Sequence, residues 1–489
     1  MISSTTRAPS RSHQYIGRLL HRIVPFVFPA AAVVLSTLLS EAAQPAENRR
    51  APNIVFILAD DLGYGDLGCY GQQLIRTPNI DRLAEQGLRF TQFYAGSTVC
   101  APSRCVLMTG RHLGHCYIRG NGKIDLRPED VTVADVLKAA GYATGLFGKW
   151  GLGHEGSDGV PTRQGFDEFF GYLDQHHAHN YYPTFLIRNE RRVALRNVVP
   201  REGKYGQGVA EEQVDYSHDL IADEALDFID RHHKQRFFLY LSVTLPHANN
   251  EAGSRGMEIP DYGDYADRDW PAPEKGRAAM IGRLDRDVGR VLKRLAQLGI
   301  DEQTVVMFTS DNGPHAEGGS DPDFFDCNGP LRGIKRDLYE GGIRVPLIVR
   351  WPETTPRGKV SPHVGYFGDL LATAADLAGA AAPAQHDGVS FAPTIKGDPE
   401  QQRNHDYLYW EFYERGSAQA VRADNWKAVV RPLGGDNLEL YDLDSDLGEQ
   451  HDVAAKHPAV VEDMRSIMKQ AHVPAALWKP RGKPARRKR

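Results

Sequence analysis

The sequence contains few cysteines and no Cys-x-x-Cys pair. Among its 489 residues the cysteines are Cys69, Cys100, Cys105, Cys116 and Cys327. Zinc sites usually show such close pairs, so the spacing does not favour zinc. In an exported protein, an odd number of cysteines leaves one thiol that needs an explanation. If one cysteine is modified, four remain, and their disulfide pairing cannot be read from the sequence.

The chain also lacks a long apolar run beyond residue 43. The run Ile23–Leu39 follows four arginines without acidic neighbours, and Ser40 and Ala42 have the small-residue spacing of a signal-peptidase site. This run is about 17 residues long and contains two prolines, which favours a cleaved signal over a membrane anchor. We therefore expect a signal peptide over residues 1–43, an exported protein (periplasmic or extracellular) and no stable membrane span.

An excess of positive charge is missing as well. Residues 43–478 carry 47 basic and 62 acidic side chains, a net charge of −15, whereas Lys479–Arg489 hold seven basic residues and no acid. A protein with this negative net charge is not suited to bind nucleic acid across its whole surface. An anionic substrate would require a metal ion and a few well-placed cations. We expect residues 479–489 to be a basic, disordered tail.

Short apolar runs alternate with helical patterns over residues 52–382, which we take as the catalytic domain. The expected buried strands are Asn53–Leu58, Tyr142–Phe147, Phe237–Thr244, Thr304–Thr309 and Pro346–Val349. The expected helices are Pro78–Gln86, Thr132–Ala140, Tyr216–Arg231 and Arg277–Leu298. This alternation predicts an α/β fold with a large, mostly parallel sheet between helices.

The pattern changes near residue 404. Short strands are expected at Tyr407–Glu411, Ala418–Arg422, Trp426–Arg431 and Leu438–Tyr441, before a helix at Pro458–Lys469. They predict a small C-terminal α+β domain with an antiparallel sheet over residues 405–475. Residues 383–404 are rich in proline, glutamine and charge, and we expect them to be the linker.

Polar residues follow four of the predicted strands. Asp60-Asp61, Gly148-Lys149-Trp150, Pro246-His247 and Asp311-Asn312 each stand just after a strand. Parallel sheets bind ligands at the carboxyl ends of their strands, so these side chains should meet. Three carboxylates and one amide oxygen suit Ca²⁺ or Mg²⁺, and Ca²⁺ better tolerates irregular coordination. Taken alone, Asp60-Asp61 fits a turn or a helix cap equally well.

Cys100 opens a second motif. In Cys100-Ala101-Pro102-Ser103-Arg104, the proline and serine suit the first turn of a helix, and Gly110 suits its end. A helix N-terminus favours an anion, and Arg104 adds a cation one turn later. The alternative is a structural cysteine at the start of a helix.

The run from Cys100 to Arg111 resembles the signature of the formylglycine-dependent (type I) sulfatases, which are arylsulfatase-like members of the alkaline phosphatase-like superfamily. It reads Cys-x-Pro-x-Arg, then Leu and Thr-Gly-Arg. The four strand-end motifs, with Lys335 and Tyr339–Arg344, extend the resemblance over roughly residues 52–380. Motifs around Trp410, Trp426 and Tyr441 resemble the small C-terminal domain of that family.

The resemblance implies hydrolysis of sulfate esters, on carbohydrates or aryl groups, by a nucleophile that a maturation enzyme makes from Cys100 by oxidation to formylglycine (3-oxoalanine). It implies that one Ca²⁺ is bound by Asp60, Asp61, Asp311, Asn312 and residue 100. It places Arg104, Lys149, His247 and Lys335 around the sulfate. One hydroxyl of the hydrated aldehyde would attack sulfur, the second would allow release of sulfate, and His247 or Lys335 would protonate the leaving alcohol.

The chain departs from the family at Gly151, where many members have a histidine that contacts formylglycine. We hypothesise that His115 takes this role, with His154 as the second choice and a merely packed or surface histidine as the alternative for each. Trp410 and Glu411 could reach the cleft as a sugar platform.

Other interpretations remain open. The segment with His176, His177, His179, Tyr181 and Tyr182 could line a substrate cleft or bind a second metal ion, although a polar loop is the simpler interpretation. A phosphomonoester or phosphonate hydrolase of the same superfamily is the alternative enzyme. A binding protein that has lost catalysis is the third possibility.

Overall fold

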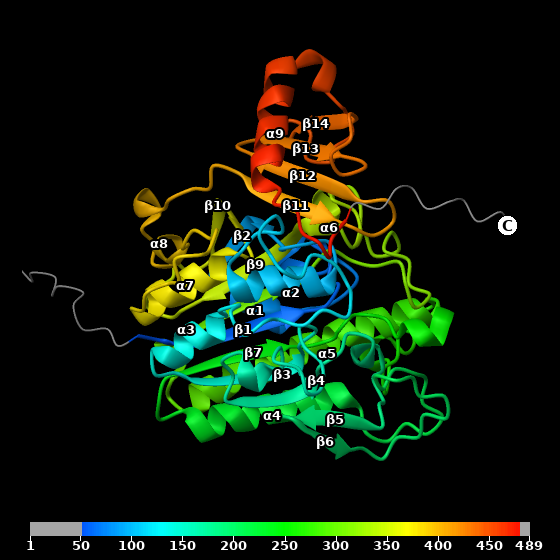
Figure 1. The fold of residues 1–489 in the computed structure, drawn as a ribbon. Coiled ribbons are helices and arrows are strands. Elements are labelled where there is room, and N and C mark those ends of the chain that lie inside the picture. Colours follow the sequence, from blue (N-terminus) through cyan, green and yellow to red (C-terminus); the bar gives the residue numbers. More distant parts are fainter. Residues whose placement is uncertain (1–50, 480–489) are drawn as a thin grey trace, which may run out of the picture. The chain divides into compact units, whose positions relative to one another are not determined.

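A ten-stranded mixed sheet forms the centre of the computed structural model, which describes residues 51–479 (Figure 1). The strand order is β10-β2-β9-β8-β1-β7-β3-β4-β5-β6. The five central strands are parallel: β8 (Thr304–Ser310), β1 (Asn53–Ala59), β7 (Phe237–Ser242), β3 (Ala143–Lys149) and β4 (Glu168–Tyr172). The flanking strands are β9 (Arg344–Arg350), β2 (Leu88–Tyr94), β10 (Lys359–Tyr366), β5 (Phe185–Arg188) and β6 (Arg191–Ala194).

The register of the central strands brings their carboxyl ends together. β1 is buried along its whole length, as expected for a continuous apolar run between two parallel neighbours. Leu58 pairs with Ser242 of β7, and Ala59 pairs with Ser310 of β8. The residues that follow these strands therefore emerge at one edge of the sheet. All five predicted strands of this region are confirmed.

Helices cover both faces of the sheet. α2 (Cys100–Thr109), α3 (Val133–Ala139) and α7 (Asp369–Ala378) contribute to one hydrophobic core, whereas α1 (Pro78–Glu85), α4 (Ser217–His232) and α5 (Ala272–Gln297) contribute to the other. α3 begins with a capping box: the hydroxyl of Thr132 accepts from the Asp135 N–H, and the carboxylate of Asp135 accepts from the Thr132 N–H. The predicted helices are confirmed, although α5 begins five residues earlier than expected, directly after Pro271.

A second, four-stranded antiparallel sheet follows. It contains β11 (Leu408–Phe412), β12 (Ala418–Ala423), β13 (Trp426–Val430) and β14 (Leu438–Asp442), and α9 (Pro458–Ala471) packs against it (Figure 1). The predicted fold class, a large mostly parallel sheet with helices plus a small antiparallel C-terminal sheet, is confirmed. Residues 383–404, the predicted linker, include the short helix α8 (Ala392–Ile395), whose first and last residues are buried in the main core.

Three further features bear on the sequence predictions. Residues 1–43, the predicted signal peptide, and residues 480–489 of the predicted tail lie outside the described residues. Among residues 51–479, no helix combines the length and apolarity that crossing a membrane requires. All five cysteines are free thiols in the structure.

Candidate active site and metal centre

The ends of β1 and β8 meet in a buried group of oxygen atoms. Asp60, Asp61, Asp311 and Asn312 are all fully buried. The backbone N–H of Asp61 donates to Asp311 Oδ1 (3.1 Å), and Asn312 Nδ2 donates to Asp61 Oδ1 (2.6 Å). Asp61 has a positive φ of 63°, so the chain turns sharply where the strand ends. The two strand ends are thus fixed against each other by their own side chains.

Cys100 is the first residue of α2 and faces this group. Its thiol lies 3.4 Å from Asp60 Oδ1 and is only 2% exposed. Burial, and then the charge of Asp60, raises the pKa of the Cys100 thiol far above its usual value. An unmodified Cys100 would therefore be protonated and a poor nucleophile, because the thiolate is the reactive form of cysteine.

Three cations balance the three carboxylates. Arg104 donates from Nε and a terminal nitrogen to Asp311 Oδ2 (3.1 and 2.8 Å). Lys149 donates to Asp60 Oδ2 (2.6 Å) and Lys335 donates to Asp61 Oδ2 (2.7 Å). Burial alone would lower the pKa of each lysine, but the facing carboxylate and the other acidic groups nearby together outweigh it and raise the pKa, so both ammonium groups stay charged.

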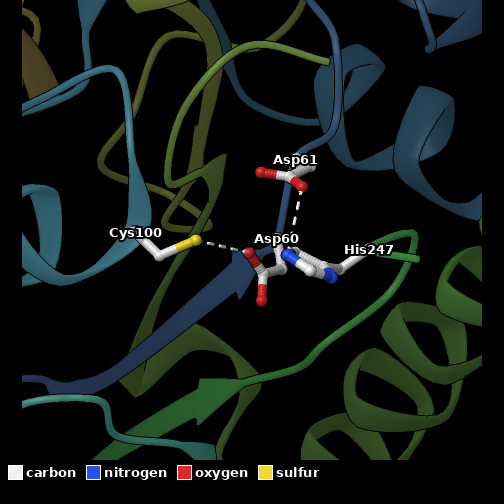
Figure 2. Close-up of side chains that lie close together, drawn as sticks. All are labelled: Asp60, Asp61, Cys100 and His247. Carbon is white, nitrogen blue, oxygen red and sulfur yellow. Dashed lines mark hydrogen bonds and ion pairs between the residues drawn. The ribbon is translucent and has the colours of Figure 1, made fainter. Parts of the chain in front are cut away.

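His247 completes the group. Its Nδ1 lies 2.7 Å from the Ala248 carbonyl, and its Nε2 lies 3.0 Å from Lys335 Nζ. Burial, and then Lys335, holds the pKa of His247 well below its usual value, so the ring is neutral. Nδ1 then carries the proton, and Nε2 accepts from the lysine. Figure 2 shows His247 beside Asp60, Asp61 and Cys100; one candidate ligand atom from each lies within 4.8 Å of the others.

The donor set fits a hard divalent cation. Asn312 Oδ1 is buried and has no hydrogen-bond partner among the described residues. A buried amide oxygen without a partner is costly unless something outside the chain coordinates it. Together with the neighbouring carboxylates, it forms an oxygen-rich group of the kind that Ca²⁺ or Mg²⁺ prefers. Burial, and then Asp60, raises the pKa of Asp311 to about 7, which a bound cation would offset.

The structure does not bring His115 or His154 into this group. Cys100 begins α2, whereas His115 lies beyond its opposite end, about 15 Å away along a ten-residue helix. There His115 Nδ1 contacts Asp387 (2.9 Å). His154 contacts Asp125 through Nδ1 (2.5 Å) and Asp174 through Nε2 (3.0 Å). The hydrogen bonds to these carboxylates raise the pKa of His154 to about 10, so this ring is a cation and not a base.

Trp410 and Glu411 do not form a sugar platform. Both are fully buried: the Trp410 indole N–H donates to the Ala95 carbonyl (2.9 Å), and Glu411 pairs with Arg119 (3.2 Å) and His472 (2.6 Å). This prediction was wrong because β11 is buried on both faces: Trp410 packs in the main core, whereas Tyr409 on the opposite face packs in the core of the C-terminal sheet.

Of three further residues beside the site, sequence reasoning missed Ser242 and His315, whereas His179 belongs to the segment considered as a possible cleft lining. The Ser242 hydroxyl accepts from Arg104 and donates to the Lys149 carbonyl (2.7 Å). His315 Nε2 donates to the Pro246 carbonyl (3.1 Å), and the His315 ring lies 6.0 Å from that of His247. His179 stacks on His247 at 5.0 Å. Ser242 is the last residue of β7 and His315 stands soon after β8, so the strand-end rule could have found both.

Comparisons with known proteins agree with this geometry. The family model described as Sulfatase matches residues 52–380, and the one described as N-sulphoglucosamine sulphohydrolase, C-terminal, matches residues 334–473. Arylsulfatase A from Homo sapiens is 33% identical over 88% of this chain and 89% of that protein. The N-acetylgalactosamine-6-O-sulfatase of Bacteroides thetaiotaomicron is 31% identical over 91% of this chain and 98% of that protein.

Solved structures point the same way. The crystal structure of Ps i-CgsB in complex with k-i-k-neocarrahexaose superposes with a TM-score of 0.73 at 28% identity, over 86% of this chain and 93% of that one. The family match covers most of the chain, and the matched region contains every residue of the buried group described above. The chain therefore belongs to the sulfatase family, within the alkaline phosphatase-like superfamily, and is a sulfuric ester hydrolase.

Proposed function

We propose that this enzyme hydrolyses sulfate esters of carbohydrates, through a formylglycine formed from Cys100 and beside a bound Ca²⁺. The observation that carries the proposal is the position of Cys100, whose sulfur lies against Asp60 among three buried cations. A protonated thiol in such a group has no evident structural use. The carbohydrate preference is supported by a relative named N-acetylgalactosamine-6-O-sulfatase and by a similar solved structure that contains a bound neocarrahexaose.

Asp60, Asp61, Asp311 and Asn312, together with residue 100, would hold the Ca²⁺. When bound, the ion would supply positive charge that acidifies a hydroxyl on residue 100 and favours negative oxygen beside it. The partnerless Asn312 Oδ1 supports this ligand set. Lys149 and Lys335 each occupy one oxygen of a neighbouring carboxylate and so orient it.

Formylglycine, once formed and hydrated, supplies a hydroxyl nucleophile and a second hydroxyl that permits regeneration of the aldehyde. In the net reaction, one water is consumed and the ester becomes an alcohol and a sulfate. Arg104, Lys149 and Lys335 keep their positive charge despite burial. They can therefore stabilise negative charge that develops on the sulfuryl oxygens, in a site where little water screens it.

Lys335 and His247 are suited to deliver the proton to the leaving alcohol. Lys335 Nζ donates to His247 Nε2 at 3.0 Å, so a proton can pass between them without movement of the backbone. Neither His115 nor His154 is in position to act as the base for sulfate release. We propose that neutral His247, the histidine nearest to Cys100 in the buried group, takes that step too.

The remaining assignments follow from the same proposal. The maturation enzyme that oxidises Cys100 is a required partner, residues 1–43 direct export to the periplasm or the extracellular space, and residues 383–404 link the two domains. The sulfated substrate enters at the strand-end edge of the sheet.

Mass spectrometry of the peptide that contains Cys100, from protein made in the native host, tests the proposal. The expected result is loss of the thiol and gain of an aldehyde. An intact thiol in active enzyme would overturn it. Rates on a sulfate ester and a phosphate ester with the same leaving group distinguish the alternative: faster phosphate hydrolysis would favour a phosphohydrolase.

A further inference from the structure

A pocket beside the candidate active site has no role in the chemistry above. It has a volume of about 400 Å³, and Lys123, Lys204 and Tyr205 form part of its lining, with His154 and Asp174. This volume lies within the range of about 300–1,000 Å³ that is usual for small-ligand sites. The pocket is lined by loop residues and by β5, on the β4–β5–β6 side of the sheet.

One wall of the pocket continues from the nucleophile. The backbone N–H of Ala101, the residue after Cys100, donates to Asn121 Oδ1 at 3.0 Å. Asn121 is exposed, and the chain reaches Lys123 two residues later. The ammonium group of Lys123 lies 4.5 Å from the centre of the Tyr205 ring. A short path along the protein surface therefore joins the site of the nucleophile to the pocket.

The other wall continues from His247. The His179 ring stacks on His247 at 5.0 Å, the His176 ring lies 5.5 Å from His179, and Tyr205 stacks on His176 at 6.4 Å. The histidine-rich segment that the sequence left unexplained thus connects the buried group to the pocket. Two independent series of contacts, from Cys100 and from His247, meet at Tyr205.

Gly151 lies between this pocket and the buried group, close to both Gln175 and Arg104. A Cβ atom added at Gly151 would lie 3.1 Å from Gln175 Cγ and 3.8 Å from Arg104 Cδ. Gln175 therefore adjoins the position where related enzymes carry a histidine. It also directly follows Asp174, which lines the pocket.

The acidic side chains of the pocket already form ion pairs with other residues of the protein. His154 lies between Asp125 and Asp174, and Glu155 pairs with Arg192 at 2.6 Å. The first of these groups contains two carboxylates and the protonated His154, and His176 also contacts Asp174 (3.2 Å), so the group keeps no more than one negative charge. The second group is neutral.

Two cations of the pocket remain available. Among residues 51–479, neither Lys123 nor Lys204 has a carboxylate within 4.0 Å. Their ammonium groups instead lie 4.5 and 5.3 Å from the centre of the Tyr205 ring. With no more than one negative charge left on the His154 group, the pocket has an excess of at least one positive charge. Such an excess stands out on a body with a net charge of −15.

We propose that this pocket binds a second anionic group of the substrate, a sulfate or a carboxylate on the sugar adjacent to the one that is desulfated. The proposal rests on the sulfatase function proposed above and deepens it, because it names polyanionic saccharides as the substrate class. Lys123 and Lys204 bind the anion, and Tyr205 provides an aromatic surface for the sugar that carries it.

Kinetics of the double variant Lys123→Gln/Lys204→Gln test the proposal. Three sulfated disaccharides serve as substrates: one whose second sugar is uncharged, one whose second sugar carries a carboxylate and one whose second sugar carries another sulfate. We expect KM to rise about five- to tenfold for one or both charged substrates, with kcat within about twofold and the uncharged substrate unaffected. Lys234→Gln, an exposed lysine at the end of α4, is the matched control.

The two charged substrates identify which anion the pocket accepts. An equal loss on all three substrates, or no loss on any, would overturn the second anion site. If the native enzyme hydrolysed no sulfate ester, the proposed function itself would fail. A binding measurement keeps the two outcomes separate: the Cys100→Ala protein should bind the charged disaccharides, by calorimetry, about five- to tenfold more weakly when both lysines are replaced. Unchanged binding there would also refute the pocket.

Discussion

Two buried ionic groups in this protein look alike and differ in function. The site cluster contains Asp60, Asp61, Asp311, Arg104, Lys149 and Lys335. The inter-sheet cluster contains Glu340 of α6 (Glu340–Ile343), Lys427 of β13 and Glu449. Both are almost fully buried, and both pair carboxylates with lysine at 2.6–3.1 Å.

The two clusters differ in whether a buried polar atom is left without a hydrogen-bond partner. In the inter-sheet cluster, Lys427 donates to Glu340 (2.8 Å) and Glu449 (3.1 Å), and the second oxygens accept from Tyr94 (2.6 Å) and the Glu340 N–H (2.6 Å). No side-chain oxygen of Glu340 or Glu449 is without a partner. The site cluster adjoins the partnerless Asn312 Oδ1 and a thiol. Buried charge alone therefore does not indicate a site, whereas an unsatisfied ligand atom beside it does.

The largest expected effect on activity is that of a substitution at Cys100. Cys100→Ala should lower kcat on an aryl sulfate by about 10⁴-fold or more, because no other nucleophile lies in the site cluster. The melting temperature should change little, since the alanine fills most of the same volume. Cys69→Ala, at a partly exposed thiol, should leave kcat unchanged. Residual turnover above about 1% in Cys100→Ala would contradict the assignment of the nucleophile.

The inter-sheet cluster should respond in the opposite way. Lys427→Met leaves buried Glu449 without its cation and Glu340 with only Arg344 (3.1 Å), so it should lower the free energy of unfolding by about 3–5 kcal/mol. The kcat of the protein that remains folded should be unchanged. Chemical denaturation measures the loss, and Lys469→Met, on the exposed side of α9, is the control. A change in kcat without loss of stability would show that this cluster is part of the active site.

The sequence predicted the site better than the cleft around it. Asp60, Lys149 and Asp311 were predictable because each follows a continuous apolar strand in a parallel sheet. Lys335 lies in a loop and was accessible only through the family resemblance. The contacts of His179 and Tyr205 depend on the path of long loops, which no local pattern encodes.

The fold shows the same division. Four of the five central parallel strands, β8, β1, β7 and β3, are largely apolar runs and were predicted, whereas the short β4 (EFFGY) was missed. β2 was missed because its sequence, LRFTQFY, mixes polar and apolar residues. β6 was missed because it is short and mostly exposed. The wrong prediction for Trp410 has a similar cause, since burial of an aromatic side chain against another domain cannot be seen in its own strand.

Binding of Ca²⁺ should also distinguish the site cluster from the inter-sheet cluster. Addition of Ca²⁺ to chelated protein should raise the free energy of unfolding by about 2.7 kcal/mol at a hundredfold excess over Kd. Asn312→Ala should remove much of this gain, because it deletes the partnerless ligand oxygen. Glu449→Gln, in the inter-sheet cluster, should keep the gain. Thermal unfolding with and without Ca²⁺ measures both, and an equal response in the two variants would refute the ligand set.

The smallest expected difference is in pH dependence. Burial, opposed by Lys427 and reinforced by Glu340, raises the pKa of Glu449 to about 7 in the folded protein, from 4.5 in the unfolded chain. The folded state therefore binds more protons than the unfolded state between these values, so Glu449 lowers stability as pH rises through this window. Burial would raise the pKa of Asp60, but the neighbouring cations, Lys149 first, outweigh it and hold that pKa below its usual value, so the contribution of Asp60 to stability is lost as pH falls.

Glu449→Gln keeps the shape of the side chain and removes its titration. At saturating Ca²⁺, the fall in unfolding free energy from pH 4.5 to pH 7 should shrink by on the order of 1–2 kcal/mol. Denaturant titrations at several pH values measure this slope, and Glu462→Gln, on the outer face of α9, is the matched control. An unchanged slope would mean that Lys427 keeps Glu449 ionised throughout. The buried carboxylates of the inter-sheet cluster would then both be charged across this pH range, as Asp60 is in the site cluster.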